Sequence, residues 1–173
     1  GQTLSIDTGT ANLTLSSAMG GSTRLGALTL QGNVINVDAN VEAQGVSILA
    51  SGSSELIDWT GVTIDANDGN VFLSSDFITF GTALSATSAT NKDLTIVGDA
   101  ANSTITVGTG GGSDGNLVIS EADLVTLASD FSNVKIGMAS ADGTIGLEAQ
   151  SDQTGLITIN AADSTLNFAG SNL

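Results

Sequence analysis

The residues of this chain that come closest to a catalytic grouping are four aspartates within one short stretch. They are Asp58, Asp65, Asp68 and Asp76. Two carboxyl groups held roughly 5–9 Å apart could hydrolyse a glycosidic bond, so a polysaccharide-active site is one alternative. The chain has no histidine to assist them and no adjacent pair of aspartates. We therefore interpret Asp65 and Asp68 as turn residues and Asp58 as an outward residue in mid-strand, and we predict no catalytic residues.

Two glycine-rich strings resemble calcium loops but lack a required residue. An EF-hand loop needs glycine at its sixth position, whereas "DANDGN" (65–70) has Gly69 fifth and Asn70 sixth. The string "GGGSDGNLV" (110–118) has Ser113 where a calcium β-roll needs its third glycine. We predict no metal site and no cofactor. Weak surface binding of calcium stays open at corner aspartates, of which the candidates are Asp99, Asp142 and Asp163.

The charge and composition exclude several classes of protein. The formal net charge is −15, and the basic residues are Arg24, Lys92 and Lys135. Nucleic acid and anionic membranes would be repelled, because both require a basic surface. The absence of cysteine and histidine excludes disulfides, ordinary zinc and iron–sulfur sites, and Cys/His or Ser/His nucleophiles. No apolar run approaches the roughly 20 residues that span a bilayer, and we predict neither membrane insertion nor a signal peptide at Gly1.

The elements that must carry these residues are short apolar–polar–apolar triplets separated by Gly, Asn and Asp turns. Such a triplet buries two side chains on one face of a strand and exposes the residue between them. The triplets fall into two series with a nearly constant step. One series starts at Leu28, Val46, Ile64, Leu84, Ile105, Ile145 and Leu166, and the other at Leu13, Ile35, Ile57, Ile78, Leu94, Leu117, Val134 and Ile157.

This repeat predicts an all-β fold, a right-handed parallel β-helix (β-solenoid) of about eight coils of roughly 21 residues. We expect residues 1–173 to form a single segment, excised from a longer repeat protein. Extra triplets, such as Val71-Phe72-Leu73, suggest a third face and a triangular cross-section. The main alternative is a β-sandwich, which also has short strands at this spacing.

One segment has the pattern of a helix instead. In "SEADLVTLASDF" (120–131), Ser120 and Asp123 form a capping-box pattern, and apolar residues follow at helical spacing. The same segment contains the triplet "VTL" (125–127), which divides the gap between Ile105 and Ile145 into two equal steps. We predict a bulged or one-turn helical corner followed by a strand at 125–127, and not a helix across 121–131.

The stretch 119–145 has a distinctive pattern, formed by Ala122, Asp123, Leu124, Leu127, Phe131, Val134, Ile136, Gly137, Asp142 and Gly143. With this pattern it resembles a segment of giant bacterial surface proteins with β-strand repeats. The coil length and the "GNV" triplets resemble those of filamentous-haemagglutinin-like adhesins. The resemblance implies a right-handed parallel β-helix used as a stalk or fibre at the cell surface. It implies no catalytic residues.

Three kinds of outward or bulky residue suggest further contacts. Trp59 ends a triplet at an inward position, and we predict that it fills the core at a wide corner. Phe72 should point outward, where it forms a lateral contact or is covered by the loop that contains 60–68. Mid-strand threonines raise an ice-binding alternative, although Asn36, Asp58 and Lys135 interrupt their column.

We therefore expect a non-enzymatic stalk or fibre module of a secreted or cell-surface bacterial protein of adhesin type. The expected partners are neighbouring coils or copies of the same protein end to end, and a host or neighbouring cell surface. The alternative is a self-assembling extracellular filament subunit, because the ends of a solenoid expose unpaired strand edges. A polysaccharide-active enzyme and an ice-binding protein are the remaining alternatives.

Overall fold

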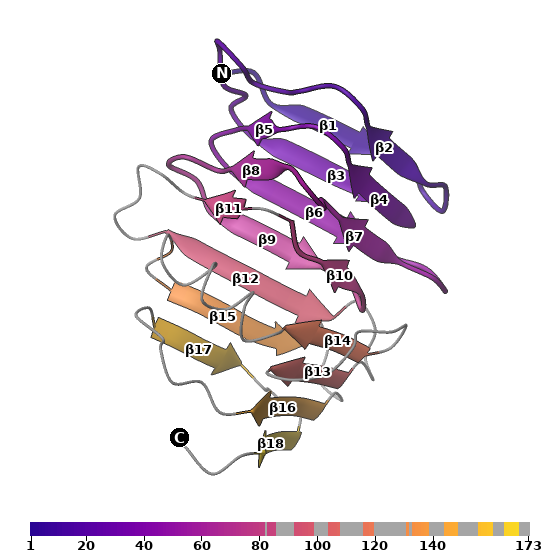
Figure 1. Cartoon of the computed structure of the whole chain (residues 1–173), viewed down its shortest axis with the longest axis vertical. Helices are drawn as coiled ribbons and strands as arrows, with labels where there is room; N and C mark the ends of the chain where they lie inside the picture. The colour runs from indigo at the N-terminus through magenta and orange to yellow at the C-terminus, as the bar shows by residue number, and fades with distance from the viewer. Residues whose placement is uncertain are drawn as a thin grey trace.

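The structure is a computed structural model that describes residues 1–81, 83–85, 92–98, 104–107, 116–119, 131, 133–138, 144–148, 156–160 and 165–169. These residues form only β-strands, turns and connecting segments, with no helix. Every strand pairing among them is parallel, and about four turns of a β-solenoid are complete (Figure 1). The predicted all-β solenoid is confirmed. The segment 120–130, with its predicted corner and "VTL" strand, lies outside the described residues.

Four sheets run along the molecule, which we name A to D. Sheet A contains, in spatial order, β1 (Leu4–Asp7), β3 (Leu28–Gly32), β6 (Val46–Ala50), β9 (Val71–Ser74), β12 (Asp93–Gly98), β15 (Asn133–Met138) and β17 (Leu156–Asn160). Sheet B contains β2 (Leu13–Leu15), β4 (Val34–Val37), β7 (Leu56–Asp58) and β10 (Ile78–Thr79). Sheet C contains β5 (Val41–Glu42), β8 (Thr63–Asp65) and β11 (Ala83–Ser85).

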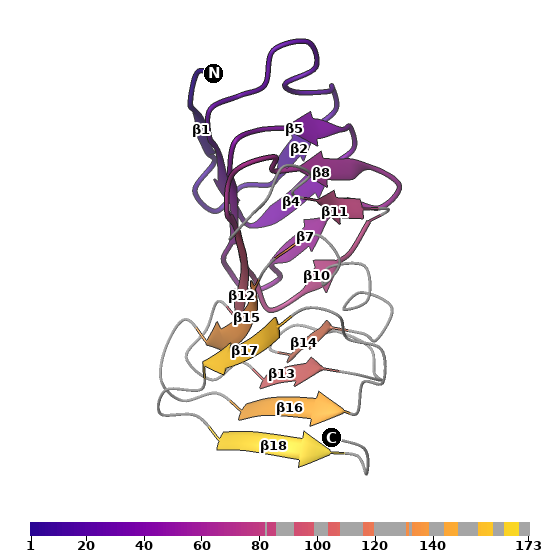
Figure 2. The same ribbon diagram turned by 90° about the vertical axis from the view of Figure 1, so that its left-hand side faces the viewer.

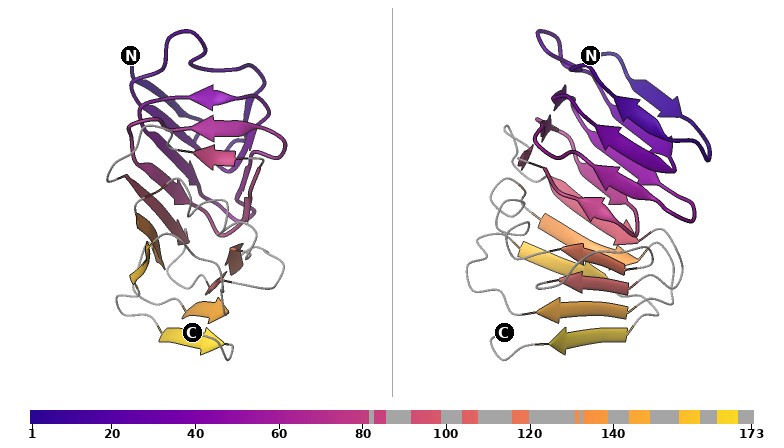
Figure 3. Two further views of the ribbon diagram at one scale, coloured as in Figure 1. Left: turned by 60° about the vertical axis from the view of Figure 1, so that its left-hand side comes forward. Right: turned by 45° about the vertical axis from the view of Figure 1, so that its right-hand side comes forward.

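Sheet D contains, in spatial order, β14 (Asn116–Ile119), β13 (Thr104–Val107), β16 (Thr144–Glu148) and β18 (Thr165–Ala169). Figure 2 shows sheets B and D one below the other, on the side of the solenoid away from sheet A. The three short strands of sheet C stack on a third side, as the magenta and pink arrows in the left view of Figure 3 show. The predicted triangular cross-section is therefore present in the second, third and fourth coils.

Sheet B follows the predicted column of triplets. Leu13, Ile35, Ile57 and Ile78 are successive register partners, in the order and at the nearly constant spacing that the sequence predicts. Ile35 and Ile57 are fully buried. Each strand presents alternate residues to the core, where β-branched and leucine side chains pack well on a pleated surface.

The other predicted series mixes two sides of the solenoid, and this is a correction. Val46 pairs with Val71 in sheet A, whereas Ile64 pairs with Val41 and Leu84 in sheet C. The second, third and fourth coils each have three strands, in agreement with the third face that the extra triplets suggested. The spacing of triplets along the chain does not reveal which side a triplet occupies, because corners of different length separate the sides.

The second series needs the same correction beyond residue 78. Leu94 pairs with Val71 and Val134 in sheet A and does not continue the column of Ile78. Leu117 pairs with Ile105 in sheet D. The strand β14 is the next strand after β13 in the chain, yet the two are parallel neighbours, and Figures 1 and 2 show β14 between β10 and β13.

Polar side chains fix the corners between coils. Asn40 and Asn70 each accept a hydrogen bond from a backbone N–H on the following coil, at Thr63 (3.0 Å) and Asp93 (3.1 Å). The "GNV" corner at 69–71 needs its glycine for close approach, since a Cβ on Gly69 would overlap the carbonyl oxygen of Gln44. A positive φ occurs at other corners, for example at Asn67 (45°) between β8 and β9.

Replacing Ile57 with alanine tests the buried column of sheet B. We expect Ile57→Ala to lower the free energy of unfolding by about 2–5 kcal/mol, because it removes buried methyl groups and leaves a cavity. The matched control is Thr14→Ala, at an exposed position of the same sheet, which should change it by less than about 0.5 kcal/mol. Urea unfolding followed by circular dichroism measures both. Equal effects would contradict the assignment of Ile57 to the core.

Candidate functional site

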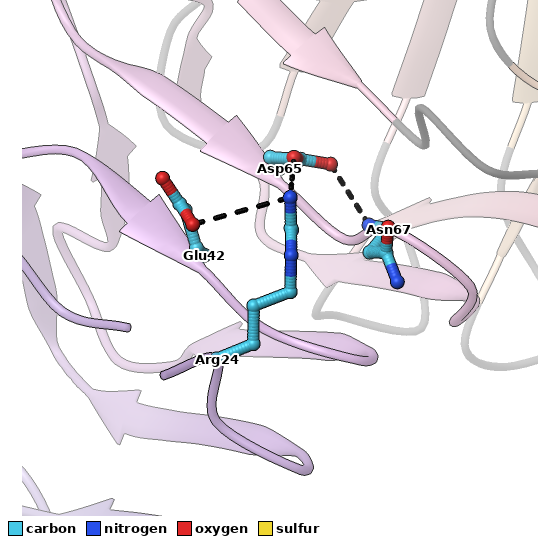
Figure 4. A network of polar contacts seen from close by, with 4 residues as sticks. All are labelled: Arg24, Glu42, Asp65 and Asn67. Atoms are coloured by element: carbon cyan, nitrogen blue, oxygen red, sulfur yellow. Dashed lines mark hydrogen bonds and ion pairs between the residues drawn. The ribbon is translucent and has the colours of Figure 1, made fainter. Parts of the chain in front are cut away.

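Two ion pairs lie on the outer surface of sheet C, around Arg24. The Nη2 of Arg24 lies 2.8 Å from Oδ2 of Asp65 and 3.9 Å from Oε2 of Glu42 (Figure 4). Glu42 and Asp65 are register partners on adjacent coils. Arg24 precedes Leu25, which bridges to Ala43, so Arg24, Glu42 and Asp65 occupy one position on three successive coils.

The strand pairing forces two carboxylates of this column together. Parallel strands lie about 4.8 Å apart, and like charges directly opposite each other destabilise a sheet. Arg24 compensates for this repulsion by placing its guanidinium beside both carboxylates. The hydrogen bond from Arg24 to Asp65 is the main cause that raises the pKa of the guanidinium above its ordinary value. A raised pKa keeps a cation charged, so Arg24 does not lose this interaction at any pH near neutrality.

A turn holds Asp65 in place for this contact. Its Oδ1 accepts a hydrogen bond of 2.9 Å from the backbone N–H of Asn67, which Figure 4 shows beside the ion pair. The backbone N–H of Gly69 donates to the carbonyl of Ala66 at 2.8 Å. The string 65–70 is thus a turn stabilised by its own backbone and side chains, as predicted for Asp65 and Asp68. Asp68 is exposed.

The four aspartates of the candidate catalytic group are distributed over different parts of the solenoid. Asp58 ends β7 in sheet B, and its Oδ1 accepts hydrogen bonds from the N–H and Oγ1 of Thr60 at 2.8 and 2.7 Å. Asp65 ends β8 in sheet C and pairs with Arg24. Asp76 is only 3% exposed, at the corner between sheets A and B. Within the described ranges, no three His, Cys, Asp or Glu side chains gather in a way that could hold a metal ion.

The corner that contains Asp76 is the most polar part of the described interior. Glu55 and Ser75 are buried there as well. The Oγ of Ser75 donates to the carbonyl of Phe77 at 2.8 Å and accepts from the Phe77 N–H at 3.1 Å. The N–H of Ile57 on the third coil also donates to the carbonyl of Phe77 on the fourth, so this corner joins the two coils. The sequence analysis did not predict that Glu55 is buried.

The aromatic residues take the predicted directions. Trp59 is 1% exposed, and its ring packs edge-on against Phe80, with centroids 5.1 Å apart and planes at 75°. Phe72 points outward between its register partners Ser47 and Thr95, and it is 36% exposed. The loop around 60–68 therefore does not bury Phe72, and a lateral contact of this ring stays a prediction.

The mid-strand threonines are spread over all four sheets. Thr29, Thr95 and Thr158 belong to sheet A, Thr14 and Thr79 to sheet B, Thr63 to sheet C and Thr106 to sheet D. The predicted interruptions are confirmed, because Asn36 and Asp58 separate Thr14 from Thr79, and Lys135 separates Thr95 from Thr158. Thr126 and the corner aspartates Asp99, Asp142 and Asp163 lie outside the described residues.

Sequence reasoning missed the role of Arg24, although a signal was present. Arg24 stands one coil before Glu42, and Glu42 stands one coil before Asp65. A search for opposite charges separated by the length of one coil would have found the group. Its arrangement can hold three coils together.

Comparison of the chain with protein-family models, curated proteins and solved structures found no match. The resemblance to filamentous-haemagglutinin-like adhesins therefore stays a prediction. In the part of the chain that the structure describes, no helix has the length and apolar character needed to cross a membrane.

Replacing Arg24 with glutamine tests the charged column. We expect Arg24→Gln to lower the denaturation midpoint, because Glu42 and Asp65 then face each other without a cation. Lys92→Gln is the matched control, since it removes the same charge and no described ion pair involves Lys92. Molar salt should reduce the difference between the two variants by screening the carboxylates. Equal midpoints at low salt would show that the column does not stabilise the fold.

Proposed function

We propose that this chain is a non-catalytic structural module, a length of β-solenoid stalk or fibre in a secreted or cell-surface bacterial protein of adhesin type. The observation that carries the proposal is the stacking of coil on coil in register along one axis. Sheet A alone continues through seven strands, from Leu4 to Asn160. Each strand takes its hydrogen bonds from the neighbouring coils, so the arrangement suits a rod that transmits force along its length.

The finer features of the proposal rest on general rules and on sequence resemblance. A right-handed path follows from the handedness of parallel crossovers. About eight coils agrees with the seven strands of sheet A and the length of the chain. The resemblance of residues 119–145 to repeats of bacterial surface proteins supports an extracellular location. The high negative charge supports solubility outside a membrane and disfavours nucleic acid as a partner.

A polysaccharide-active enzyme is not part of the proposal, because Asp58 and Asp65 belong to different sheets and Asp65 is engaged by Arg24. We expect the protein to release no product from acidic polysaccharides, and Asp65→Asn and Asp68→Asn to behave like the unchanged chain. A reducing-end assay on polygalacturonate and alginate measures this. Cleavage by the unchanged chain that either substitution abolishes would overturn the non-catalytic assignment.

The mechanical role is tested by pulling the chain between its two ends in a single-molecule force experiment, with marker domains on both sides. We expect a clear unfolding force, since extension must separate strands that pair along the whole axis. Ile57→Ala should lower this force, because it loosens the packing of adjacent coils, and Thr14→Ala should leave it unchanged. A chain that extends without measurable resistance would contradict the stalk proposal.

A second candidate function, a filament subunit that stacks end to end, is favoured by the state of the first coil. The core residues Leu4 and Ile6 are only partly buried, whereas their register partners Leu28 and Leu30 on the next coil are buried. The apolar side chains of β1 are therefore partly exposed, whereas Leu13 and Leu15 of β2 are buried. The edge of β1 is suited to accept another coil, supplied by a preceding part of a longer chain or, in a filament, by a second copy.

A further inference from the structure

We propose that Asn12 is an acceptor site for N-linked glycosylation, and that the first sugars of the attached glycan pack over a row of apolar side chains on the outer side of sheet B. The row consists of Val34, Leu56 and Phe77, on the three coils that follow Asn12. This inference goes beyond the stalk and filament proposals and does not depend on either of them.

The acceptor sequence is Asn12-Leu13-Thr14, which matches the N-x-[ST] pattern of glycosylated asparagines. Such a pattern also arises by chance in a chain rich in asparagine, serine and threonine, so only a match that the fold exposes is a candidate. A second match, Asn102-Ser103-Thr104, has its asparagine and serine outside the described residues, and we draw nothing from it.

The fold exposes both polar residues of the acceptor sequence. Asn12 immediately precedes β2 and is exposed, as is Thr14, whereas Leu13 between them is buried. Alternate residues of an extended segment point to opposite sides, so Asn12 and Thr14 face outward together while Leu13 holds the segment on the core. The side-chain amide of Asn12 is thereby accessible to a glycosyltransferase.

The turn before Asn12 fixes the backbone of this corner. The N–H of Ala11 donates to the carbonyl of Thr8 at 3.1 Å, and the Oγ1 of Thr8 donates to the carbonyl of Ala11 at 2.9 Å. The N–H of Asn33 on the second coil donates to the same carbonyl of Ala11 at 3.0 Å. The backbone of Asn12 is therefore held at a defined place on the rod, directly beside the second coil.

The apolar row continues from Asn12 along the outer side of sheet B, which lies away from sheet A (Figure 2). The register of sheet B places Val34 next to Asn12, and Leu56 and Phe77 follow on the third and fourth coils. All three are half-buried and alternate with residues that face the core, so they point outward. At a strand spacing of about 4.8 Å, the row extends about 14 Å from Asn12.

A sugar ring suits this row because its faces carry C–H groups and its edge carries hydroxyls. An apolar face can pack on Val34 and then on Leu56, which removes apolar surface from water. The edge can form hydrogen bonds with the polar column beside the row, which contains Thr14, Asn36 and Asp58. We expect a neutral glycan, since an acidic one would be repelled by a chain of net charge −15.

The modification requires a glycosyltransferase and a sugar donor whose anomeric carbon carries a diphosphate. The Nδ2 of Asn12 forms a C–N bond to that carbon, the C–O bond to the diphosphate breaks, and Nδ2 gives up one proton to a base of the enzyme. Nothing is oxidised or reduced. A nucleotide-linked donor would add one sugar and a lipid-linked donor a preassembled oligosaccharide, so the added mass distinguishes the two donors.

Mass spectrometry of the chain purified from the cells that produce it tests the site. Trypsin cleaves after basic residues, so Asn12 falls in the peptide that ends at Arg24, and the second match falls in the peptide 93–135. We expect the first peptide to carry a glycan on Asn12, to lack it in Asn12→Gln, and to keep it in Thr14→Ser, which preserves the pattern. A first peptide that is unmodified, or modified at another residue, would overturn the assignment of Asn12.

Thermal unfolding of the same preparations tests the packing of the glycan over the row. Asn12→Gln should lower the midpoint by about 2–4 °C, because the row is then left without the glycan. In the background of Val34→Ser this difference should fall by at least half. Leu49→Ser is the matched control, since it replaces another half-buried aliphatic side chain, on the outer side of sheet A, and it should leave the difference unchanged. No difference, or an equal difference in all three backgrounds, would show that the glycan does not lie on the row.

Discussion

A parallel strand of this chain cannot form its hydrogen bonds within its own coil, and the other features of the molecule follow from this. Each of β3, β6, β9 and β12 has its partners on the preceding and following coils, a whole coil or more away in sequence. Burial follows the same rule, because a single coil has too few side chains to enclose a core. Each coil is therefore stabilised by the coils next to it. A coil with a neighbour on one side only has fewer strand hydrogen bonds and less buried apolar surface than an internal coil.

The pairing of strands between coils also determines which charged side chains lie next to each other. Stacking places equivalent positions about 4.8 Å apart, so any acidic position that repeats becomes a column of like charges. In a chain with 18 acidic and three basic residues this problem is general. On sheet C one arginine solves it by contacting the carboxylates of the next two coils. In sheet B the column reads Thr14, Asn36, Asp58 and Thr79, so no two acids are adjacent there.

Two of the carboxylates that invite a chemical interpretation, those of Asp58 and Asp65, are engaged by neighbouring groups. Asp65 has the backbone of Asn67 on one oxygen and the guanidinium of Arg24 on the other. The Oδ1 of Asp58 accepts a hydrogen bond from the backbone N–H of Thr60, just after the end of β7. These carboxylates are occupied in turning the chain and joining coils. Such contacts are in keeping with the mechanical role proposed above.

Local patterns in the sequence were enough to predict the class of fold, the inward and outward alternation, and the column from Leu13 to Ile78. These follow from the period of two along a strand and from turn residues, both of which are local properties. The side of the solenoid that each triplet occupies could not be predicted, because the loops that connect sheet A to sheet B differ in length from coil to coil. The contact of Arg24 with Asp65 could be found in the sequence only by searching for opposite charges one coil apart, and the burial of Glu55 was visible only in the folded chain. Such features join residues whole coils apart, and a pattern confined to a few neighbouring residues carries no information about them.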